Sequence, residues 1–321
     1  MLNRRQLRVK VVQAIYAYEL SENGQLEVGE KELFKSLNDI ERLFVCQLSL
    51  LLEVADFAAL RMEDAKSKFF PTEEEKNPST RFIDNRVLQK IRQNITMQSR
   101  IKAYKISWTE YQEMIRKLYN NLKVSDIYKD YLYAEKDSFG TDKTFLEKMY
   151  YQFYVENEDI ESFYEEQNIH WASDYDIVNN MILRYVKGIK ADQGENAYFP
   201  QVFRIDNVDG VSEDKVFVKD LFRKCVINKD KHIQLIAERA TNWEFDRIAT
   251  MDKLLLRMAV TELMLFPSIP VKVTLNEYIE LSKIFSTPRS RIFINGVLDK
   301  MIEQLRADKK IVKTGRGLME N

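Results

Sequence analysis

The sequence predicts an all-α protein, and three observations favour that fold class. The 321 residues include only nine glycines and six prolines, too few to supply the turns of a sheet-rich fold. Apolar residues make up 45 % of the chain and recur at spacings of three and four, which is the period of an amphipathic helix. Charged residues reach 31 %, which suits the solvated faces of such helices. We therefore expect long helices joined by short loops.

The first expected helix covers residues 3–20. Its core stripe consists of Leu7, Val11, Ala14, Ile15 and Tyr18. A neighbouring face carries Arg5, Arg8, Val12 and Tyr16. Lys10 falls on another part of the circumference, where we expect a surface lysine. The run SENG then ends the helix.

The next expected helix is the longest, residues 31–69, and it ends at FFPTEEEKNPST, which holds two prolines and a charge run. Further helical patterns follow near residues 80–104, 108–134, 144–168 and 173–189. The stretch KGIKADQGENAYFPQVFRIDNVDG holds three glycines and a proline. It predicts a long connection that includes a short extended piece.

Helical patterns resume near residue 212, and prolines and capping residues mark their ends. The expected helices are residues 212–227, 230–240, 251–266, 271–285 and 288–305. Pro267 ends one helix, and Pro270 lies near the first turn of the next. Ser286 or Thr287 is the expected N-cap before Pro288 at the first helical position. The polar, basic residues 306–321 predict a disordered tail.

Charge is unevenly distributed along a chain whose formal net charge is only −1. Residues 76–126 carry eleven Lys or Arg against four acids, and residues 135–176 carry twelve acids against three lysines. Two interpretations remain open for these blocks. They are solvated helix faces, or they pair with each other within one subdomain.

The sequence contains no constellation typical of catalysis. No GxxxxGK[ST] loop, glycine fingerprint or GxSxG elbow is present. The two cysteines and two histidines are far apart in sequence, so we expect no metal site, no disulfide and no cofactor, with buried thiols and surface imidazoles. No secretory signal or membrane-spanning segment is expected, and the protein is predicted to be cytoplasmic and not an enzyme.

The strongest functional signal is the concentration of cations at the start of the first helix. Arg4, Arg5, Arg8 and Lys10 lie within NRRQLRVK. The helix macrodipole disfavours cations at a helix N-terminus, whereas a guanidinium fork fits a phosphate well. Tyr16 is placed to stack an unpaired base. A solvated helix start and an interface tyrosine are the alternatives.

Separate stretches of the chain resemble the NusB family of transcription antitermination factors. The opening RRQLRVKVVQAIYAYELS is similar to the family's first helix. The later blocks are DKLLLRMAVTEL, IPVKVTLNEYIELSKIF and FINGVLDK. The resemblance covers about a third of the chain, and it implies an all-α bundle of two small helical subdomains with a large helical insertion. We expect the NusB-like RNA-binding domain to consist of residues 1–21 and 212–305. The insertion is then residues 22–211, and the tail is residues 306–321. The helix at residues 31–69 belongs either to the core of the domain or to the insertion.

The resemblance also implies a function. Proteins of this family bind boxA-type single-stranded RNA together with the ribosomal protein NusE, and they help RNA polymerase read through terminators, notably in ribosomal RNA operons. The expected partners are therefore boxA-like RNA, NusE and the RNA polymerase antitermination complex, with no membrane.

The residues that match the family's RNA-contacting positions are Arg4, Arg5, Arg8, Tyr16, Phe293 and Asn295. Glu262 matches a partner-facing acidic position, and we place it on the margin of the apolar stripe. Gly296 is expected to permit close helix approach. The run PRSRI departs from the family's pattern, and we expect Arg289 and Arg291 to supply the missing cation to phosphates.

Two other classes of function remain open. One is a protein-interaction scaffold that acts through the insertion. The other is a relative of ribosomal RNA methyltransferases, which requires an additional strand–helix domain with a glycine-rich loop. Under the RNA-binding interpretation, Arg5→Ala with Arg8→Ala is expected to weaken RNA binding without unfolding the first helix.

Overall fold

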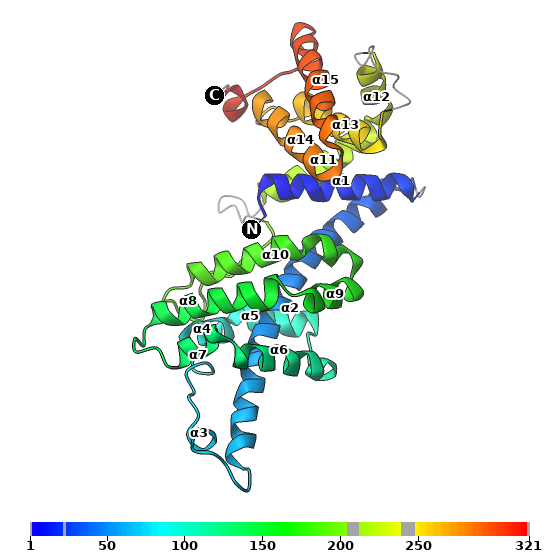
Figure 1. Ribbon diagram of the computed structural model, residues 1–321. Helices are drawn as coiled ribbons and strands as arrows, with labels where there is room; N and C mark the ends of the chain where they lie inside the picture. The colour runs from blue at the N-terminus through cyan, green and yellow to red at the C-terminus, as the bar shows by residue number, and fades with distance from the viewer. Residues whose placement is uncertain (1, 22–23, 204–211, 239–247, 320–321) are drawn as a thin grey trace. The chain divides into compact units, whose positions relative to one another are not determined.

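The computed structural model describes residues 2–21, 24–203, 212–238 and 248–319. Within those ranges every regular element is helical, which confirms the predicted all-α class (Figure 1). The α-helices are α1 (Arg4–Leu20), α2 (Leu26–Lys66), α3 (Glu73–Lys76), α4 (Arg86–Gln93), α5 (Ile95–Tyr104), α6 (Gln112–Val124), α7 (Asp126–Leu132), α8 (Phe139–Tyr150), α9 (Glu158–Gln167), α10 (Ile169–Gly188), α11 (Glu213–Ile227), α12 (Lys229–Ala237), α13 (Thr250–Leu265), α14 (Val271–Phe285) and α15 (Pro288–Ala307). Short turns are the 3₁₀ segments η1 (Thr109–Tyr111) and η4 (Gly315–Leu318) and the π segment η2 (Tyr151–Val155).

The helices expected after residue 212 are confirmed, and α14 has the expected bounds. Helix α15 begins at Pro288, with the Thr287 side chain accepting a hydrogen bond from the Ser290 backbone N–H. The helices expected at residues 80–104, 108–134 and 144–168 are each interrupted. The N-caps of the new helices are Asn94, Ser125 and Asn157, whose side chains accept hydrogen bonds from the backbone N–H groups three residues on. These polar N-caps end one helix and begin the next despite a continuous apolar period.

The connection after α10 was expected to contain a short extended piece. Residues 189–203 contain no strand, and the remainder of that connection lies outside the described residues.

The chain divides into two compact units, and α2 contributes to both. Unit 1 consists of Met1–Leu37 and Phe203–Asn321, and unit 2 consists of Asn38–Val202. The boundary falls inside α2, between Leu37 and Asn38.

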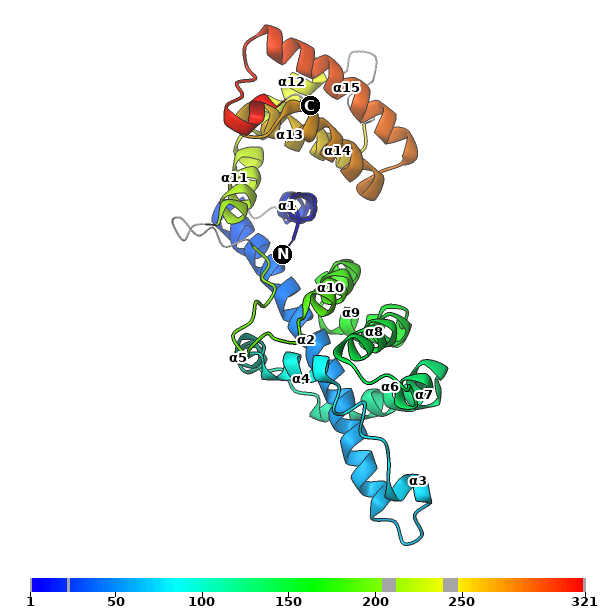
Figure 2. The same cartoon turned by 90° about the vertical axis from the view of Figure 1, so that its left-hand side faces the viewer.

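Unit 1 is organised around α13. This helix is buried along its whole length from Leu254 to Leu263 and contacts α1, α11, α12, α14 and α15 (Figure 2). A helix that is covered on every side needs apolar residues all round, and the run LLLRMAVTELML provides them, apart from Arg257, Thr261 and Glu262. The partners of these three polar residues define the chemistry of the unit.

Unit 2 is assembled on the part of α2 that follows residue 37. Helix α2 packs against distant segments through aromatic rings and buried hydrogen bonds. Its contacts are Phe44 with Tyr185 and Phe199, Gln47 with Tyr150 and Asn179, Ser49 with Trp108, and Phe57 with Tyr119. Each segment therefore buries its apolar face on the same long helix.

The oppositely charged blocks of unit 2 do pair with each other. The Arg86 Nε atom lies 2.6 Å from an Asp142 carboxylate oxygen, and Lys117 forms an ion pair with Asp159. Both pairs join the basic block to the acidic block, which confirms the pairing interpretation for these residues. The Lys117–Asp159 pair is exposed, and exposed pairs contribute roughly 0–1 kcal/mol each, whereas the Asp142 carboxylate of the other pair is buried.

An 18-residue window of α2 is apolar enough to cross a membrane by composition, contrary to the sequence-based expectation. Within unit 2 the same helix is the one on which the surrounding segments pack, and 67 % of the window is buried inside the structure. Burial by other helices is the pattern of a core helix.

Part of the predicted disordered tail lies against unit 1 through hydrogen bonds from Lys313 and Thr314. After α15 the chain returns to the turn between α13 and α14 (Figure 2). The Thr314 backbone N–H donates to the Pro267 carbonyl at 3.0 Å, and the Lys313 ammonium donates to the Phe266 carbonyl at 3.0 Å. The lysine thus satisfies a carbonyl at the C-terminal end of α13, where the macrodipole favours a cation.

Gly317→Ala is expected to detach this tail. A Cβ atom at position 317 would lie 1.9 Å from the Pro267 carbonyl oxygen, and a backbone atom has little freedom to move aside. We expect a loss of about 1–3 kcal/mol in the stability of unit 1, as for other overpacked sites, and faster hydrogen exchange in residues 311–319.

Gly296→Ala serves as the control for this substitution. Gly296 is exposed, and a Cβ atom there would meet nothing within 4 Å, so the expected role in close helix approach is wrong. This variant is expected to gain up to about 1 kcal/mol from helix propensity. Slow exchange in the tail of Gly317→Ala would contradict the packing role of Gly317.

Candidate nucleic-acid interface

The N-terminal end of α1 is capped by polar side chains while carrying three arginines. The Asn3 side chain accepts a hydrogen bond from the Gln6 backbone N–H at 2.9 Å, and the Gln6 side chain accepts one from the Asn3 backbone at 2.8 Å. This capping box starts the helix at Arg4 without an acidic residue in the first turn. The arginines that follow reach α11, α13 and α14.

Arg4 lies half-exposed against α11. Its Nε atom is 2.8 Å from an Asp214 carboxylate oxygen, and its Nη2 atom is 3.8 Å from Glu213. The guanidinium also lies over the Phe217 ring, 4.4 Å from the ring centroid. The side chain is 39 % exposed, so one edge of the guanidinium faces solvent.

Arg5 lies against α14 and is 41 % exposed. Its Nε and Nη2 atoms donate to the two oxygens of Glu277 at 3.1 and 3.0 Å, and its Nη1 atom is 3.8 Å from Glu280. The Glu277 hydrogen bond raises the pKa of the Arg5 guanidinium. Because the pair is partly exposed, its net contribution to stability is small. A phosphate that approaches from solvent is therefore able to compete for Arg5.

The expectation that Arg8 lies exposed is wrong. Arg8 is 2 % exposed, and its Nε and Nη2 atoms donate to the Glu262 carboxylate at 2.8 and 2.7 Å. Burial by itself lowers the pKa of this guanidinium, but the charge and hydrogen bonds of Glu262, together with the smaller effects of Tyr278 and Glu277, outweigh burial, and the net pKa is raised. Arg8 faces α13 because it adjoins the core stripe of α1. Its guanidinium has no free face for RNA in this structure.

The expectation that Glu262 lies on the margin of the apolar stripe of α13 is also wrong. The residue is fully buried, and Thr274 donates to its carboxylate at 2.8 Å alongside Arg8. The Tyr278 hydroxyl donates to the same carboxylate at 3.4 Å. A buried carboxylate requires such donors. Glu262 therefore joins α13 to α1 and α14 and presents no surface to a partner.

A second ion pair of opposite polarity joins α1 to α13. Arg257 of α13 is buried, and its Nη2 atom lies 2.7 Å from the Glu19 carboxylate, which also pairs with Lys229 at 3.2 Å. Burial raises the pKa of Glu19, but the hydrogen bonds and charges of Arg257 and Lys229 together outweigh burial, and the net pKa is lowered. The two ion pairs, Arg8–Glu262 and Glu19–Arg257, fix both the direction and the register of α1 against α13.

Two further placements need correction. Lys10, expected on the surface, is 1 % exposed, and so is His232, expected to be a surface imidazole. The His232 Nδ1 atom lies 3.0 Å from the Thr261 hydroxyl, which itself donates to the Arg257 carbonyl at 2.8 Å. That hydroxyl has one proton, so the imidazole Nδ1–H is the donor to Thr261. Burial and the nearby charges of Lys231 and Arg257 favour the neutral ring here.

Acidification is expected to destabilise unit 1 through His232. Burial, reinforced by the charges of Lys231 and Arg257, lowers the pKa of His232 from 6.5 to about 4. The unfolded chain takes up this proton near pH 6.5 while the folded chain resists it until about pH 4, so stability falls across that window as pH decreases. A tenfold difference in proton affinity between the folded and unfolded chains corresponds to about 1.4 kcal/mol. Denaturation of the wild type and His232→Gln at several pH values measures this contribution, and parallel pH profiles would contradict it.

The start of α15 carries two exposed arginines. Arg289 and Arg291 form no ion pair with any residue that the structure describes. Arg291 and Arg5 both lie near enough to Glu280 to lower the pKa of that carboxyl, after the larger effect of Lys283. The cations of α1 and α15 thus flank the same acidic position on α14.

The remaining predicted site residues lie on α15 and on α1. Phe293 and Asn295 are half-buried on α15, and the Asn295 amide donates to Asp299 at 3.0 Å. Tyr16 is 38 % exposed. It follows Arg5 by eleven residues on the same face of α1, about 16 Å along the axis. The structure therefore leaves the phenol ring available for stacking.

The sequence did not predict which carboxylates pair with Arg4 and Arg5. Glu277 and Glu280 stand three residues apart on α14, and Asp214 opens α11. The only signal in the sequence is that an acidic pair at this spacing shares one helix face. Among the described residues, no group of three or more His, Cys, Asp or Glu side chains is arranged to hold a metal ion.

Comparisons with known proteins identify relatives of this chain. Residues 188–303 match the model of the NusB family. Three proteins, each called a transcription antitermination protein NusB, are similar. The Salinibacter ruber protein is 45 % identical over 103 residues, which are 32 % of this chain and 64 % of that protein. The Chloroherpeton thalassium protein is 38 % identical over 106 residues, which are 32 % of this chain and 50 % of that protein. The Koribacter versatilis protein is 35 % identical over 121 residues, which are 37 % of this chain and 83 % of that protein.

No solved structure matches the chain. The matched stretch spans less than two thirds of the first two relatives, but it spans 83 % of the third at 35 % identity. This extent of agreement, together with the matched family model, shows that the chain belongs to the NusB family.

Proposed function

We propose that this protein is a cytoplasmic transcription antitermination factor, not an enzyme, whose unit 1 binds boxA-type single-stranded RNA together with the ribosomal protein NusE. The complex promotes read-through by RNA polymerase, notably in ribosomal RNA operons. Unit 1 then corresponds to the NusB-like domain and unit 2 to inserted material. The names of the three relatives support the antitermination role.

One observation carries the RNA-binding part of the proposal. Arginines from α1 and α15 flank Glu280 on α14, and the two on α15 have no ion-pair partner among the described residues. Unpaired exposed guanidinium groups are suited to phosphate contact, because their planar fork matches the phosphate oxygens. The contact surface we propose consists of Arg4, Arg5, Tyr16, Arg289 and Arg291, with Phe293 and Asn295 beside it.

Arg8 and Glu262 act as positioning residues in this proposal. Their buried pair holds α1 against α13, so Arg4 and Arg5 project toward α11 and α14. Simultaneous loss of Arg5 and Arg8 is therefore no clean test of RNA contact, because Arg8→Ala leaves Glu262 buried without its cation. Arg5→Ala by itself removes the exposed group and leaves the buried pair intact.

RNA binding by unit 1 is expected to involve an exchange of partners at Arg5. The guanidinium leaves Glu277 and Glu280 for a phosphate, and the carboxylates then repel the RNA backbone. Glu277→Gln with Glu280→Gln is therefore expected to tighten RNA binding, by about tenfold at low salt for two removed charges. A fluorescence anisotropy titration measures this gain, and weaker binding by the double variant would contradict the exchange.

The direct test is a gel-shift assay of the full chain with boxA-like RNA, with and without NusE. We expect binding at low salt that strengthens when NusE is present, and a steep decrease in affinity with salt. Absence of binding in both cases at low salt would reject the RNA-binding proposal and favour a scaffold that acts through unit 2. The methyltransferase alternative has no support within residues 38–202, where the described elements are all helices.

A further inference from the structure

Unit 2 contains a cavity of about 380 Å³ whose walls are rich in aromatic rings. Helix α2 contributes Arg42 and Cys46, which lie one helical turn apart. The rings come from three other segments, and they are Tyr104, Trp108, Tyr111, Phe163 and Trp171. A volume of this size is typical of pockets that hold a small ligand.

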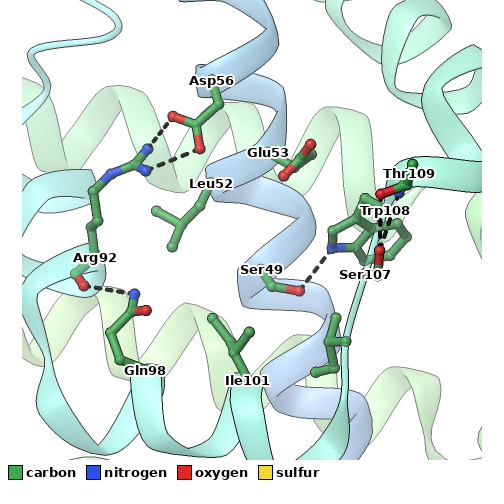
Figure 3. A pocket seen from close by; sticks show the side chains of 11 residues that line it. Ser49, Leu52, Glu53, Asp56, Arg92, Gln98, Ile101, Ser107, Trp108 and Thr109 are labelled. Carbon is green, nitrogen blue, oxygen red and sulfur yellow. Dashed lines mark hydrogen bonds and ion pairs between the residues drawn. The ribbon is translucent and has the colours of Figure 1, made fainter.

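The rings form a connected and fixed group. The Phe163 centroid lies 4.9 Å from Tyr111 and 5.8 Å from Trp108. The Trp108 indole N–H donates to Ser49 on α2 at 2.9 Å, and the Trp171 indole N–H donates to the Asp39 carbonyl at 3.1 Å (Figure 3 shows the Trp108 bond). The two tryptophans are buried and anchored, while Tyr111 and Phe163 are half-exposed. A partly exposed ring held by anchored neighbours is a stacking platform that needs little ordering on binding.

The charge of this cavity differs from that of its neighbour across Trp108. The neighbouring cavity, about 310 Å³, has one cation, and Arg92 there is engaged by both carboxylate oxygens of Asp56 at 2.6 and 3.0 Å (Figure 3). In the aromatic cavity, neither Arg42 nor Lys105 has a carboxylate partner among the residues that the structure describes. The single lining carboxylate is Glu110. The aromatic cavity therefore favours an anionic ligand with a flat ring.

Lys105 occupies a backbone conformation that normally belongs to glycine. It caps α5 in the left-handed region at φ 53° and ψ 42°. Residues with a Cβ atom adopt this conformation at a cost of about 1 kcal/mol, and glycine usually takes this place at a helix end. A lysine at such a position places a cation at the cavity at the expense of stability, and strained backbone of this kind is often found at functional sites.

We infer that this cavity binds one nucleotide of single-stranded RNA, with the base stacked on Phe163 beside the Tyr111 ring, which is inclined to Phe163 by 72°, and the phosphate held by Arg42 and Lys105. Aromatic stacking accepts any base, and the two cations neutralise the backbone, which together make a sequence-tolerant contact. A positively charged ligand does not fit, because Arg42 and Lys105 would repel it. The inference rests on the proposed function, since it takes RNA as the ligand of the chain. It adds a second RNA contact that lies wholly within unit 2.

Arg42→Gln with Lys105→Gly tests the electrostatic half of the site in the full-length chain. Lys105→Gly removes the cation and relieves the left-handed backbone, so the fold is expected to be retained or stabilised. With a short fluorescent single-stranded RNA as the probe, we expect affinity to fall about tenfold and the salt slope to fall by about 0.7, because the two cations hold one phosphate. Lys309→Gly is the matched control, because Lys309 also has a φ of 53° and lies in unit 1, outside the cavity.

Phe163→Leu tests the stacking half of the site. We expect a loss of affinity of about tenfold with an unchanged salt slope, because a ring is lost but no charge. RNA that carries 4-thiouridine is expected to cross-link to residues 104–111, and excess AMP to abolish that cross-link. AMP is expected to leave cross-links to α1 in place.

The outcomes separate the two proposals. Wild-type RNA binding that is unaffected by Arg42→Gln/Lys105→Gly and by Phe163→Leu would overturn the nucleotide site and leave the proposed function standing. No RNA binding by the wild-type chain would overturn both. Binding of an acidic peptide at this cavity in place of RNA would also overturn the nucleotide assignment.

Discussion

Glu262→Ala is expected to cost about 3–5 kcal/mol of the stability of unit 1, the usual effect of removing one partner of a buried ion pair; Glu277, 3.7 Å from Arg8, is the one carboxylate left beside it among the described residues. Arg8 is 2 % exposed, and Glu262 supplies the carboxylate for both of its short hydrogen bonds. Thr274 and Tyr278 lose their acceptor in the same variant. Unit 1 is therefore expected to unfold at a much lower denaturant concentration than in the wild type.

The double variant Arg8→Met/Glu262→Leu identifies the cause of that loss. It removes both charges and replaces them with apolar side chains, and such replacements are often neutral or stabilising. We expect the part of the loss that comes from the uncompensated Arg8 charge to return, while the unpaired Thr274 and Tyr278 hydroxyls keep the double variant below the wild type, by about 1–3 kcal/mol for each hydroxyl that finds no other partner. A double variant less stable than Glu262→Ala would contradict this account.

The measurement has to report on unit 1 separately. Two of the three tryptophans, Trp108 and Trp171, lie in unit 2, so the total tryptophan fluorescence mixes the two units. Hydrogen exchange in α13 and α14, followed by mass spectrometry at increasing denaturant, gives the local stability. Glu280→Gln is the surface control, since Glu280 is partly exposed and its ion pairs are worth little. We expect it to change stability by less than about 0.5 kcal/mol.

Arg289→Glu with Arg291→Glu is expected to weaken RNA binding about a hundredfold at low salt, roughly tenfold for each lost phosphate contact. Both side chains are exposed at the start of α15. The slope of log affinity against log salt is expected to fall by about 1.4, because each contact with a single strand releases about 0.7 of a counterion. Titrations of a boxA-like RNA at several salt concentrations measure both quantities.

Lys300→Glu provides the control on the same helix. Lys300 is exposed, and it lies about 13 Å along the axis from Arg291. We expect a small uniform loss of affinity and no change in slope. Unchanged affinity and slope in Arg289→Glu/Arg291→Glu would remove α15 from the interface and leave α1 as the candidate surface.

Much of the fold follows from the apolar period and the local capping signals. The bounds of α14 follow from Pro270 and the period alone, and the start of α15 follows from Thr287 and Pro288. The breaks inside the middle helices were missed for a physical reason. At Asn94 and Ser125 a polar side chain competes for the backbone N–H groups, and this competition leaves the spacing of the apolar residues unchanged.

The candidate site was less accessible to prediction. Two charges, Arg257 and Glu262, stand within the apolar run LLLRMAVTELML, and this contrast is a signal for buried ion pairs. The run does not reveal which partners they have, because Glu19 and Arg8 lie more than two hundred residues away in the chain. The His232 environment was missed for the same reason, since its partner Thr261 belongs to another helix.

The amino-acid order was sufficient to establish an all-helical chain, a cationic first helix and a family resemblance. Packing assigned different roles to arginines that look alike in the sequence. Arg5 and Arg8 are three residues apart on α1, yet Arg5 is 41 % exposed and Arg8 is 2 % exposed. Helix α13 covers one side of α1 and provides Glu262 there, whereas solvent reaches the other side. A helical period specifies which residues share a face. Whether a charged side chain on that face is buried and paired or exposed to solvent depends on which other helices pack against the face.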